Sequence, residues 1–335
     1  DIALPAGTLT IVASSAILFL GPLQPMKLEP GEHVVRAIDG PMATVTVIED
    51  QNSIQRLRIN NRVQEGSSAA SPVEARLALI PLLLHPQPRH ALFLGWGTGY
   101  TARIAALDDQ LQVQAVELLP EVILASTQFD AVPRFPPTRA AVQLTQADAR
   151  RFVLASPQRF DLIVADLFHP ARSGAGSLYT LEHYRALRDR LTSGGVVCQW
   201  LALHQMELDT LRSVIAAFRA VFPHAIMILA SNSLDTPVIG LVARLDEPME
   251  SSAEVSERLA RISPRLRPEL QRTGLLDAES VLGSMLVGGQ RLQSWLGDVR
   301  ANSDDRPIVT YAAPWDTYRP QSTPAQRLEI GRAHV

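Results

Sequence analysis

Residues 92–107, LFLGWGTGYTARIAAL, place three glycines between a short apolar run and a segment with helical character. A continuous apolar run of this length is typical of a strand that is buried on both faces of a parallel sheet. Glycines let the backbone approach a ligand closely, and the N-terminus of the following helix attracts electronegative groups. Gly95, Gly97 and Gly99, with Thr98 among them, therefore predict a ligand-binding loop. A tight strand-to-helix turn without a ligand is the alternative.

Strand and helix patterns alternate outward from this loop. The apolar runs that predict strands occur in HALFLG, LQVQAVEL, AAVQLTQAD, FDLIVAD and VVCQWLA, and helical segments separate them. Repeated strand–helix units predict an α/β fold with a doubly wound, mostly parallel sheet. Residues 34–64 instead alternate apolar and polar side chains, which predicts a small antiparallel β-unit. The segment QEGSSAASP, residues 64–72, predicts a linker or mobile loop.

No charged residue occurs from Ile2 to Met26. This stretch approaches the roughly 20 apolar residues that a helix needs to cross a bilayer, so it predicts a membrane span. A buried helix or a pair of strands is the alternative. The sequence starts at Asp1 rather than at a methionine, so we expect a fragment in which this span is the last of several. We therefore expect a membrane-associated protein with a cytoplasmic catalytic domain, and a cytoplasmic protein as the alternative.

These patterns divide the chain into five parts. We expect a transmembrane segment at residues 1–26, a β-unit and linker at 27–71, a Rossmann-like catalytic domain at 72–245, a helical extension at 246–320 and a tail at 321–335. The last residues, EIGRAHV, resemble translated adapter DNA from sequencing libraries, so we expect them to be artefactual.

Charge and cysteine content exclude several classes of protein. The 335 residues carry a net charge of −3 and no dense block of Lys and Arg, which argues against a nucleic-acid-binding protein. Cys198 is the only cysteine, so an internal disulfide or a cysteine metal cluster is excluded. Because no His, Asp or Glu cluster has the spacing of metal ligands, we predict no metal.

Two acidic residues follow the strands next to the glycine loop. Glu117 ends the second strand, 18 residues after Gly99, where an acid can accept hydrogen bonds from ribose hydroxyls. Asp148 follows the third strand beside Ala149 and could accept a hydrogen bond from an exocyclic amine such as that of adenine. Capping of the next helix is the equally favoured alternative for Asp148. Together these features predict an adenosine pocket at the carboxyl edge of the sheet.

A third acid, Asp166, ends a buried strand and opens the loop of VADLFHPARSGAGSLYT, residues 164–180. A carboxylate in this position can accept a proton from a substrate. His169 is its nearest ionisable neighbour and could also accept a proton when neutral. The alternative is that His169, which precedes Pro170, only shapes the loop through backbone hydrogen bonds.

The ordered set of motifs resembles the polyamine aminopropyltransferases, the spermidine synthase family, and in particular bacterial membrane-fused spermidine-synthase-like proteins. The resemblance covers residues 34–245 and rests on PLLLHPQPRHALFLGWGTG, VELLPEV, DARRF, RFDLIVADLFHP and GAGSLYTLEHYRALRDRLTSGGVVCQW. It implies a class I methyltransferase-like Rossmann fold with the β-unit over its mouth. It also implies a homodimer, a small-molecule amine substrate and no tightly bound cofactor. Decarboxylated S-adenosylmethionine or S-adenosylmethionine would be the co-substrate.

The resemblance also implies roles for individual residues. Glu117 would hold the ribose and Asp148 the adenine, while Asp166 would be the acid that takes up the attacking amine. Gln64 and Tyr179 would line the pocket.

Three positions depart from the family pattern. Thr98 stands where spermidine synthases typically carry an acid that binds the free amine of the donor and disfavours a donor carboxylate. His169 replaces the second aspartate of an Asp-x-x-Asp pair, and Val73-Glu74 replaces a Tyr-His pair. We therefore expect an aminopropyltransferase with an unassigned amine acceptor. An S-adenosylmethionine-dependent methyltransferase, in which Arg172 pairs with the donor carboxylate, is one alternative. A non-catalytic, membrane-tethered protein that binds an adenosyl compound or a polyamine is the other.

Overall fold

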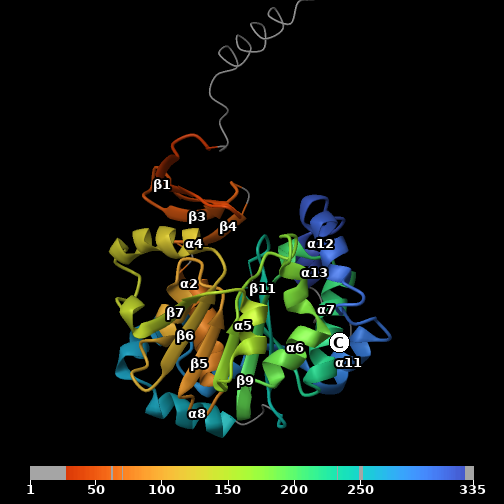
Figure 1. Ribbon diagram of the computed structural model, residues 1–335. Helices are drawn as coiled ribbons and strands as arrows, with labels where there is room; N and C mark the ends of the chain where they lie inside the picture. The colour runs from red at the N-terminus through yellow and green to blue at the C-terminus, as the bar shows by residue number, and fades with distance from the viewer. Residues whose placement is uncertain (1–27, 62, 70, 232, 249–251, 329–335) are drawn as a thin grey trace, which may run out of the picture.

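The computed structural model in Figure 1 describes residues 28–61, 63–69, 71–231, 233–248 and 252–328. Within these ranges no helix is both long enough and apolar enough to cross a bilayer. The predicted membrane span at residues 1–26 and the final residues 329–335 lie outside the described residues.

An eight-stranded sheet forms the centre of the molecule, with the strand order β12-β10-β11-β9-β8-β5-β6-β7. The strands are β5 (His90–Leu94), β6 (Gln112–Glu117), β7 (Val142–Gln146), β8 (Phe160–Ala165), β9 (Leu191–Ala202), β10 (Ile226–Ser231), β11 (Val238–Arg244) and β12 (Met285–Gly288). The five strands from β7 to β9 run parallel, and the last three add antiparallel pairs at one edge. The predicted α/β fold with a mostly parallel sheet is confirmed.

The apolar run of β5 is continuous because helices cover both faces of the sheet. Phe93 packs into one hydrophobic core, whereas Leu92 and Leu94 pack into the other, and all three side chains are buried. The first core is shared by α2 (Ser71–Leu83), α3 (Tyr100–Ala105), α4 (Pro120–Ala125), α8 (Ser252–Arg261), α9 (Arg267–Thr273) and α10 (Ala278–Leu282). The second is shared by α5 (Ala149–Ala155), α6 (Leu181–Arg188), α7 (Leu208–Val221), α11 (Gly289–Leu296) and α12 (Ile308–Tyr318).

A separate four-stranded antiparallel sheet precedes this core and confirms the predicted β-unit. Its strands are β1 (His33–Asp39), β2 (Thr44–Glu49), β3 (Gln55–Ile59) and β4 (Val63–Ser67), paired in that order. Figure 1 shows the β-unit above the ends of β5, β6 and β7, next to α4. Arg36 Nη1 on β1 donates a hydrogen bond of 2.9 Å to Thr127 Oγ1, which follows α4.

The linker predicted at residues 64–72 is wrong over most of its length. Residues 64–67 belong to β4, which pairs with the free edge of β3, and α2 begins at Ser71. The small polar residues of this segment form a strand because the unpaired backbone groups of β3 offer hydrogen-bond partners. Only three residues therefore separate the β-unit from the central domain.

Residues 252–328 include the segments that brace the loop that follows β8. The helical extension predicted at residues 246–320 also contributes a strand, β12, which pairs antiparallel with β10. A further helix, α13 (Pro324–Leu328), lies in the predicted tail. Asn302 is fully buried, and its Nδ2 donates a hydrogen bond of 2.8 Å to the Tyr179 carbonyl. The Asn302 Oδ1 accepts from the backbone N–H of Val309 at 3.2 Å. One buried amide thus joins the start of α12 to the end of the β8–α6 loop.

His183 on α6 should make the stability of the protein dependent on pH. Its imidazole is fully buried, and burial, reinforced by Arg150, lowers its pKa to about 3. Because the pKa in the unfolded chain is about 6.5, the stabilisation is complete above pH 6.5 and is lost as the pH falls toward 3. Between pH 7 and pH 5 we expect His183 alone to account for a loss of about 2 kcal/mol.

The measurement is urea denaturation at pH 7 and pH 5 of the wild type and of His183→Phe. The variant should lose less stability between the two pH values than the wild type does. The exposed residue His224 provides the control, because His224→Phe should keep the wild-type dependence. Equal losses for the wild type and His183→Phe would contradict the prediction.

Candidate functional site

A cavity of about 1120 Å³ lies at the carboxyl ends of the parallel strands, beneath the β-unit. Met42, Ile59 and Gly66 contribute to it from the β-unit. Eight of the residues predicted from the sequence line this one cavity, namely Gly95, Gly97, Thr98, Glu117, Asp148, Ala149, Asp166 and His169. Parallel strands bring their carboxyl ends to one edge of a sheet, so residues as far apart in the sequence as Gly95 and His169 meet there.

The glycine loop allows two close approaches that a side chain would prevent. Gly95 has a φ of +98°, and a Cβ there would stand 3.0 Å from the Cβ of Asp166. Gly99 has a φ of +84°, and a Cβ there would overlap the indole ring of Trp96. Trp96 is buried, and its Nε1 donates a hydrogen bond of 2.8 Å to Ser126 Oγ. Gly99 does not line the cavity within the described residues, so its conformation follows from the packing of Trp96.

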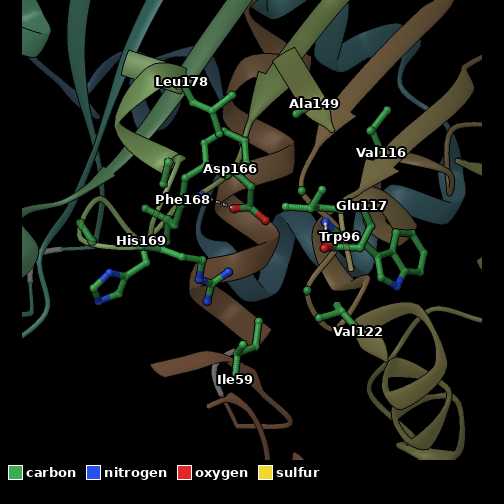
Figure 2. A pocket seen from close by; sticks show the side chains of 18 of the residues that line it. Ile59, Trp96, Val116, Glu117, Val122, Ala149, Asp166, Phe168, His169 and Leu178 are labelled. Carbon is green, nitrogen blue, oxygen red and sulfur yellow. Dashed lines mark hydrogen bonds between the residues drawn. The ribbon is translucent and has the colours of Figure 1, made fainter. Parts of the chain in front are cut away.

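The two acids predicted to hold adenosine are both fixed by backbone hydrogen bonds. Glu117 Oε2 accepts from the N–H of Trp96 at 3.1 Å, and Oε1 accepts from the N–H of Leu119 at 2.9 Å. These bonds hold the carboxylate at the mouth of the glycine loop, as Figure 2 shows. Asp148 caps α5, because its Oδ1 accepts from the N–H of Arg151 at 2.8 Å. Asp148 therefore combines the capping position with a place in the cavity wall.

Asp166 is positioned by the strands on both sides of β8. Its N–H donates to the Leu94 carbonyl of β5 at 2.9 Å, and Gln199 of β9 donates to its carbonyl at 3.4 Å. The carboxylate Oδ1 accepts from the N–H of Leu167 at 2.8 Å. Figure 2 shows the carboxylate directed into the cavity, on the side of Glu117.

The loop after Asp166 keeps His169 neutral and away from the acid. The imidazole is buried, and burial together with the charge of Arg172 lowers the pKa of His169 to about 4. Its ring stacks on Tyr318 of α12, with centroids 6.5 Å apart. In Figure 2 the ring points away from the Asp166 carboxylate. At neutral pH His169 therefore adds no positive charge to the cavity, and the geometry does not pair it with Asp166.

Tyr179 lies beneath this loop instead of in the cavity wall. Its side chain is buried, and its hydroxyl donates a hydrogen bond to the Phe168 carbonyl. The two rings meet edge to face, with centroids 6.5 Å apart. Within the described residues Tyr179 is not part of the cavity lining, so its contacts are those of an anchor for the loop. Gln64 belongs to β4 by its backbone, and its side chain lies outside the described part of the structure.

Three side chains that the motif analysis did not select as site residues also shape the cavity. Trp96 lines it beside the glycine loop. Gln199 is outside the lining within the described residues and donates a hydrogen bond to the backbone carbonyl of Asp166. Glu74 enters from α2, and burial, reinforced by the nearby Asp166, raises its pKa to about 8. Only Glu74 left a signal in the sequence, as an acid in place of the Tyr-His pair typical of the family. Among the described residues, no group of three His, Cys, Asp or Glu side chains could hold a metal ion.

Comparisons with known proteins agree with this geometry. Residues 71–233 match the family model described as the spermine/spermidine synthase domain. The polyamine aminopropyltransferase 2 of Hyperthermus butylicus is 30% identical over 199 residues, which cover 57% of this chain and 63% of the relative. A putrescine N-methyltransferase 2 of Nicotiana attenuata is 24% identical over 226 residues, covering 63% and 59%. The chain thus spans about three fifths of the length of these relatives.

The solved structures show the same fold. A probable spermidine synthase from Corynebacterium glutamicum has a TM-score of 0.58 and 19% identity, and the match covers 81% of this chain and 97% of that one. This likeness confirms the predicted methyltransferase-like Rossmann core with an antiparallel β-unit. The domain match, the aminopropyltransferase relative and the shared fold agree with the motifs that converge on the cavity. Residues 71–233 therefore form a domain that is similar to the spermidine synthase family.

Proposed function

We propose that this protein is an aminopropyltransferase that uses decarboxylated S-adenosylmethionine as the donor and a small amine as the acceptor. The observation that supports it best is that Asp166 lies in the same cavity as Glu117 and Asp148, the two acids suited to ribose and adenine. The cavity is large enough for a nucleoside with a short tail, since ligand pockets typically measure about 300–1,000 Å³. The donor is a co-substrate, and we propose no tightly bound cofactor.

The reaction is a displacement at the carbon next to the donor sulfonium. The lone pair of the acceptor nitrogen forms a new C–N bond as the C–S bond breaks, and its electrons neutralise the sulfur to give methylthioadenosine. The attacking nitrogen gives up one proton, which Asp166 accepts. Because the sulfonium is already a good leaving group, the enzyme mainly has to align its two substrates and remove this proton. Figure 2 places the Asp166 carboxylate beside the glycine loop, where the sulfur end of a nucleoside held by Glu117 would lie.

His169 and Tyr179 have supporting roles in this proposal. Tyr179 holds the Phe168 carbonyl and so fixes the loop that starts at Asp166. His169 is neutral and stacked on Tyr318, so it positions the loop and leaves proton transfer to Asp166.

We also propose that residues 1–26 anchor the protein to a membrane with the catalytic domain in the cytoplasm, and that two chains form a homodimer. The support for the anchor is the absence of charge from Ile2 to Met26.

Fractionation of cells that express the full-length gene should recover the protein in the membrane pellet, and release by salt or carbonate would contradict a spanning anchor. A version that starts at residue 27 should move to the soluble fraction.

Replacement of Asp166 by asparagine should remove the base and keep the shape of the site. We expect the rate of aminopropyl transfer to fall by about 10²- to 10⁴-fold, whereas the affinity for methylthioadenosine should be unchanged. The measurement combines a transfer assay on a panel of diamines with calorimetry. Asp189→Asn, at an exposed position, is the matched control and should keep full activity. Full transfer activity in Asp166→Asn would disprove the assignment of the base.

A methyltransferase is the second candidate, since Thr98 lacks the acid that disfavours a donor carboxylate and a relative is a putrescine N-methyltransferase. The cavity nevertheless contains Asp166, whose carboxylate repels the carboxylate of a donor. We therefore expect decarboxylated S-adenosylmethionine to bind at least about tenfold more tightly than S-adenosylmethionine, a difference of about 1.4 kcal/mol. Calorimetry with the two donors measures this ratio. Equal or tighter binding of S-adenosylmethionine, together with methyl transfer to putrescine, would favour the second candidate.

A further inference from the structure

The Glu74 side chain lies where the glycine loop approaches the β-unit, at the edge of the cavity that the β-unit covers. Gly66 of β4 has a φ of +122°, and a Cβ at this position would stand 2.9 Å from Glu74 Oε1 and 2.7 Å from Thr98 Cγ2. The Glu74 carboxylate and the Thr98 side chain therefore lie side by side under the backbone of β4. All three residues line the cavity that contains Asp166.

The Glu74 carboxyl group is only partly satisfied by the protein. It accepts a hydrogen bond from the backbone N–H of Ser67. Its Oε2 is shielded from solvent and has no hydrogen-bond partner within the described residues. Leaving a buried polar atom unpaired costs about 1–3 kcal/mol, more for a charged group, so an atom in this state indicates a missing hydrogen-bond partner.

The described part of the protein does not supply a cation for this acid. No ion pair with Glu74 occurs among the described residues. Arg76, two positions along α2, points away from the cavity and donates to the Ala230 and Thr273 carbonyls. Arg150, in the cavity wall, is paired with Asp304 of the C-terminal region. Each of these guanidinium groups is held by other partners.

Asp166 is a second acid in the same cavity, and its charge acts on Glu74. Burial and the charge of Asp166 raise the pKa of Glu74 to about 8, so at neutral pH the empty site keeps a proton on Glu74. A bound cation would offset the repulsion between the two carboxylates and give Oε2 a donor. The cation must also supply several N–H groups in a narrow space, which an alkylammonium group with its three donors does.

We propose that Glu74 and Asp166 together bind one alkylammonium group, with Glu74 as the residue that selects amine-bearing substrates. The inference deepens the proposed function and rests on it for the identity of the substrates. The ammonium could come from the aminopropyl tail of the donor or from the acceptor amine. The position of Glu74 beside Thr98 favours the donor tail, and the experiment separates the two sources.

The test is calorimetry of Glu74→Gln, which keeps the shape of the side chain and removes its charge. The affinity for decarboxylated S-adenosylmethionine should fall at least about tenfold, whereas that for methylthioadenosine, which lacks the amine, should stay the same. In a second arm, putrescine is titrated into the complex with methylthioadenosine. A loss confined to the first arm identifies the donor tail, and a loss confined to the second identifies the acceptor. Unchanged affinities in both arms, or an equal loss for methylthioadenosine, would overturn the proposal.

Two further variants separate charge from structure. Glu121 is also a buried glutamate with an unpaired oxygen among the described residues, but it lies outside the cavity lining, so Glu121→Gln should leave all three affinities unchanged. The double variant Glu74→Gln/Thr98→Asp returns the acid from the neighbouring glycine loop. The double variant should regain most of the affinity for the amine-bearing ligand that Glu74→Gln loses. If Glu74 had only a structural role, Thr98→Asp would not restore this affinity.

The unaltered protein gives an independent measurement if Glu74→Gln does not fold. At pH 7 the binding of decarboxylated S-adenosylmethionine, or of putrescine in the second arm, should release close to one proton from Glu74. Methylthioadenosine should release none. The other charged or titratable side chains of the cavity wall are Glu117, Asp148, Arg150, Arg151, His169, Arg172 and His204. These groups are present for every ligand, so the difference isolates the amine site. Equal proton release with and without the amine would overturn the proposal.

The outcomes also distinguish this inference from the proposed function. If the wild type binds amines in a Glu74-dependent way but transfers no aminopropyl group, the proposed function fails and the ammonium site stands. If Asp166→Asn abolishes transfer but Glu74→Gln keeps the wild-type affinities, the ammonium site fails and the proposed function stands.

Discussion

The cavity depends on one close approach between the end of β8 and the glycine loop after β5. The N–H of Asp166 bonds to the Leu94 carbonyl, and the absence of a side chain at Gly95 lets the Asp166 Cβ lie against the loop. The N–H of Gly95 in turn bonds to the Val116 carbonyl of β6, next to Glu117. Three neighbouring parallel strands thus set the distance between the acid that would take the proton and the acid that would hold the nucleoside. A side chain at position 95 would separate them.

The remaining parts of the structure maintain this arrangement from two sides. The β-unit covers the strand ends and brings Gly66 against Glu74 and Thr98 (Figure 1). The C-terminal region braces the loop after Asp166 through Asn302, and Arg150 pairs with Asp304. The cavity is therefore enclosed by segments that lie more than 100 residues apart in the sequence.

The charges of the cavity show how far the family pattern can be rearranged. Thr98 and His169 each stand where the family carries an acid, and the structure keeps His169 neutral. Glu74 brings a carboxyl group back from a different element, α2, to the point where Thr98 lies. The cationic substrates that we propose would need negative charge at this point of the cavity, and any element that reaches it can supply that charge.

Most of the fold and half of the site follow from local patterns in the sequence. The apolar runs, the glycines and the acids Glu117 and Asp166 at the strand ends predict a parallel sheet with a ligand edge, because strand burial and topology obey short-range rules. Contacts between distant segments decide the β4 strand, the turn of the His169 ring away from Asp166, the anchoring of Tyr179 and the approach of Glu74 to Asp166. A single sequence records which side chains are available. Only the tertiary structure decides which of them face the same cavity, because the direction of a side chain is set by the packing of its neighbours.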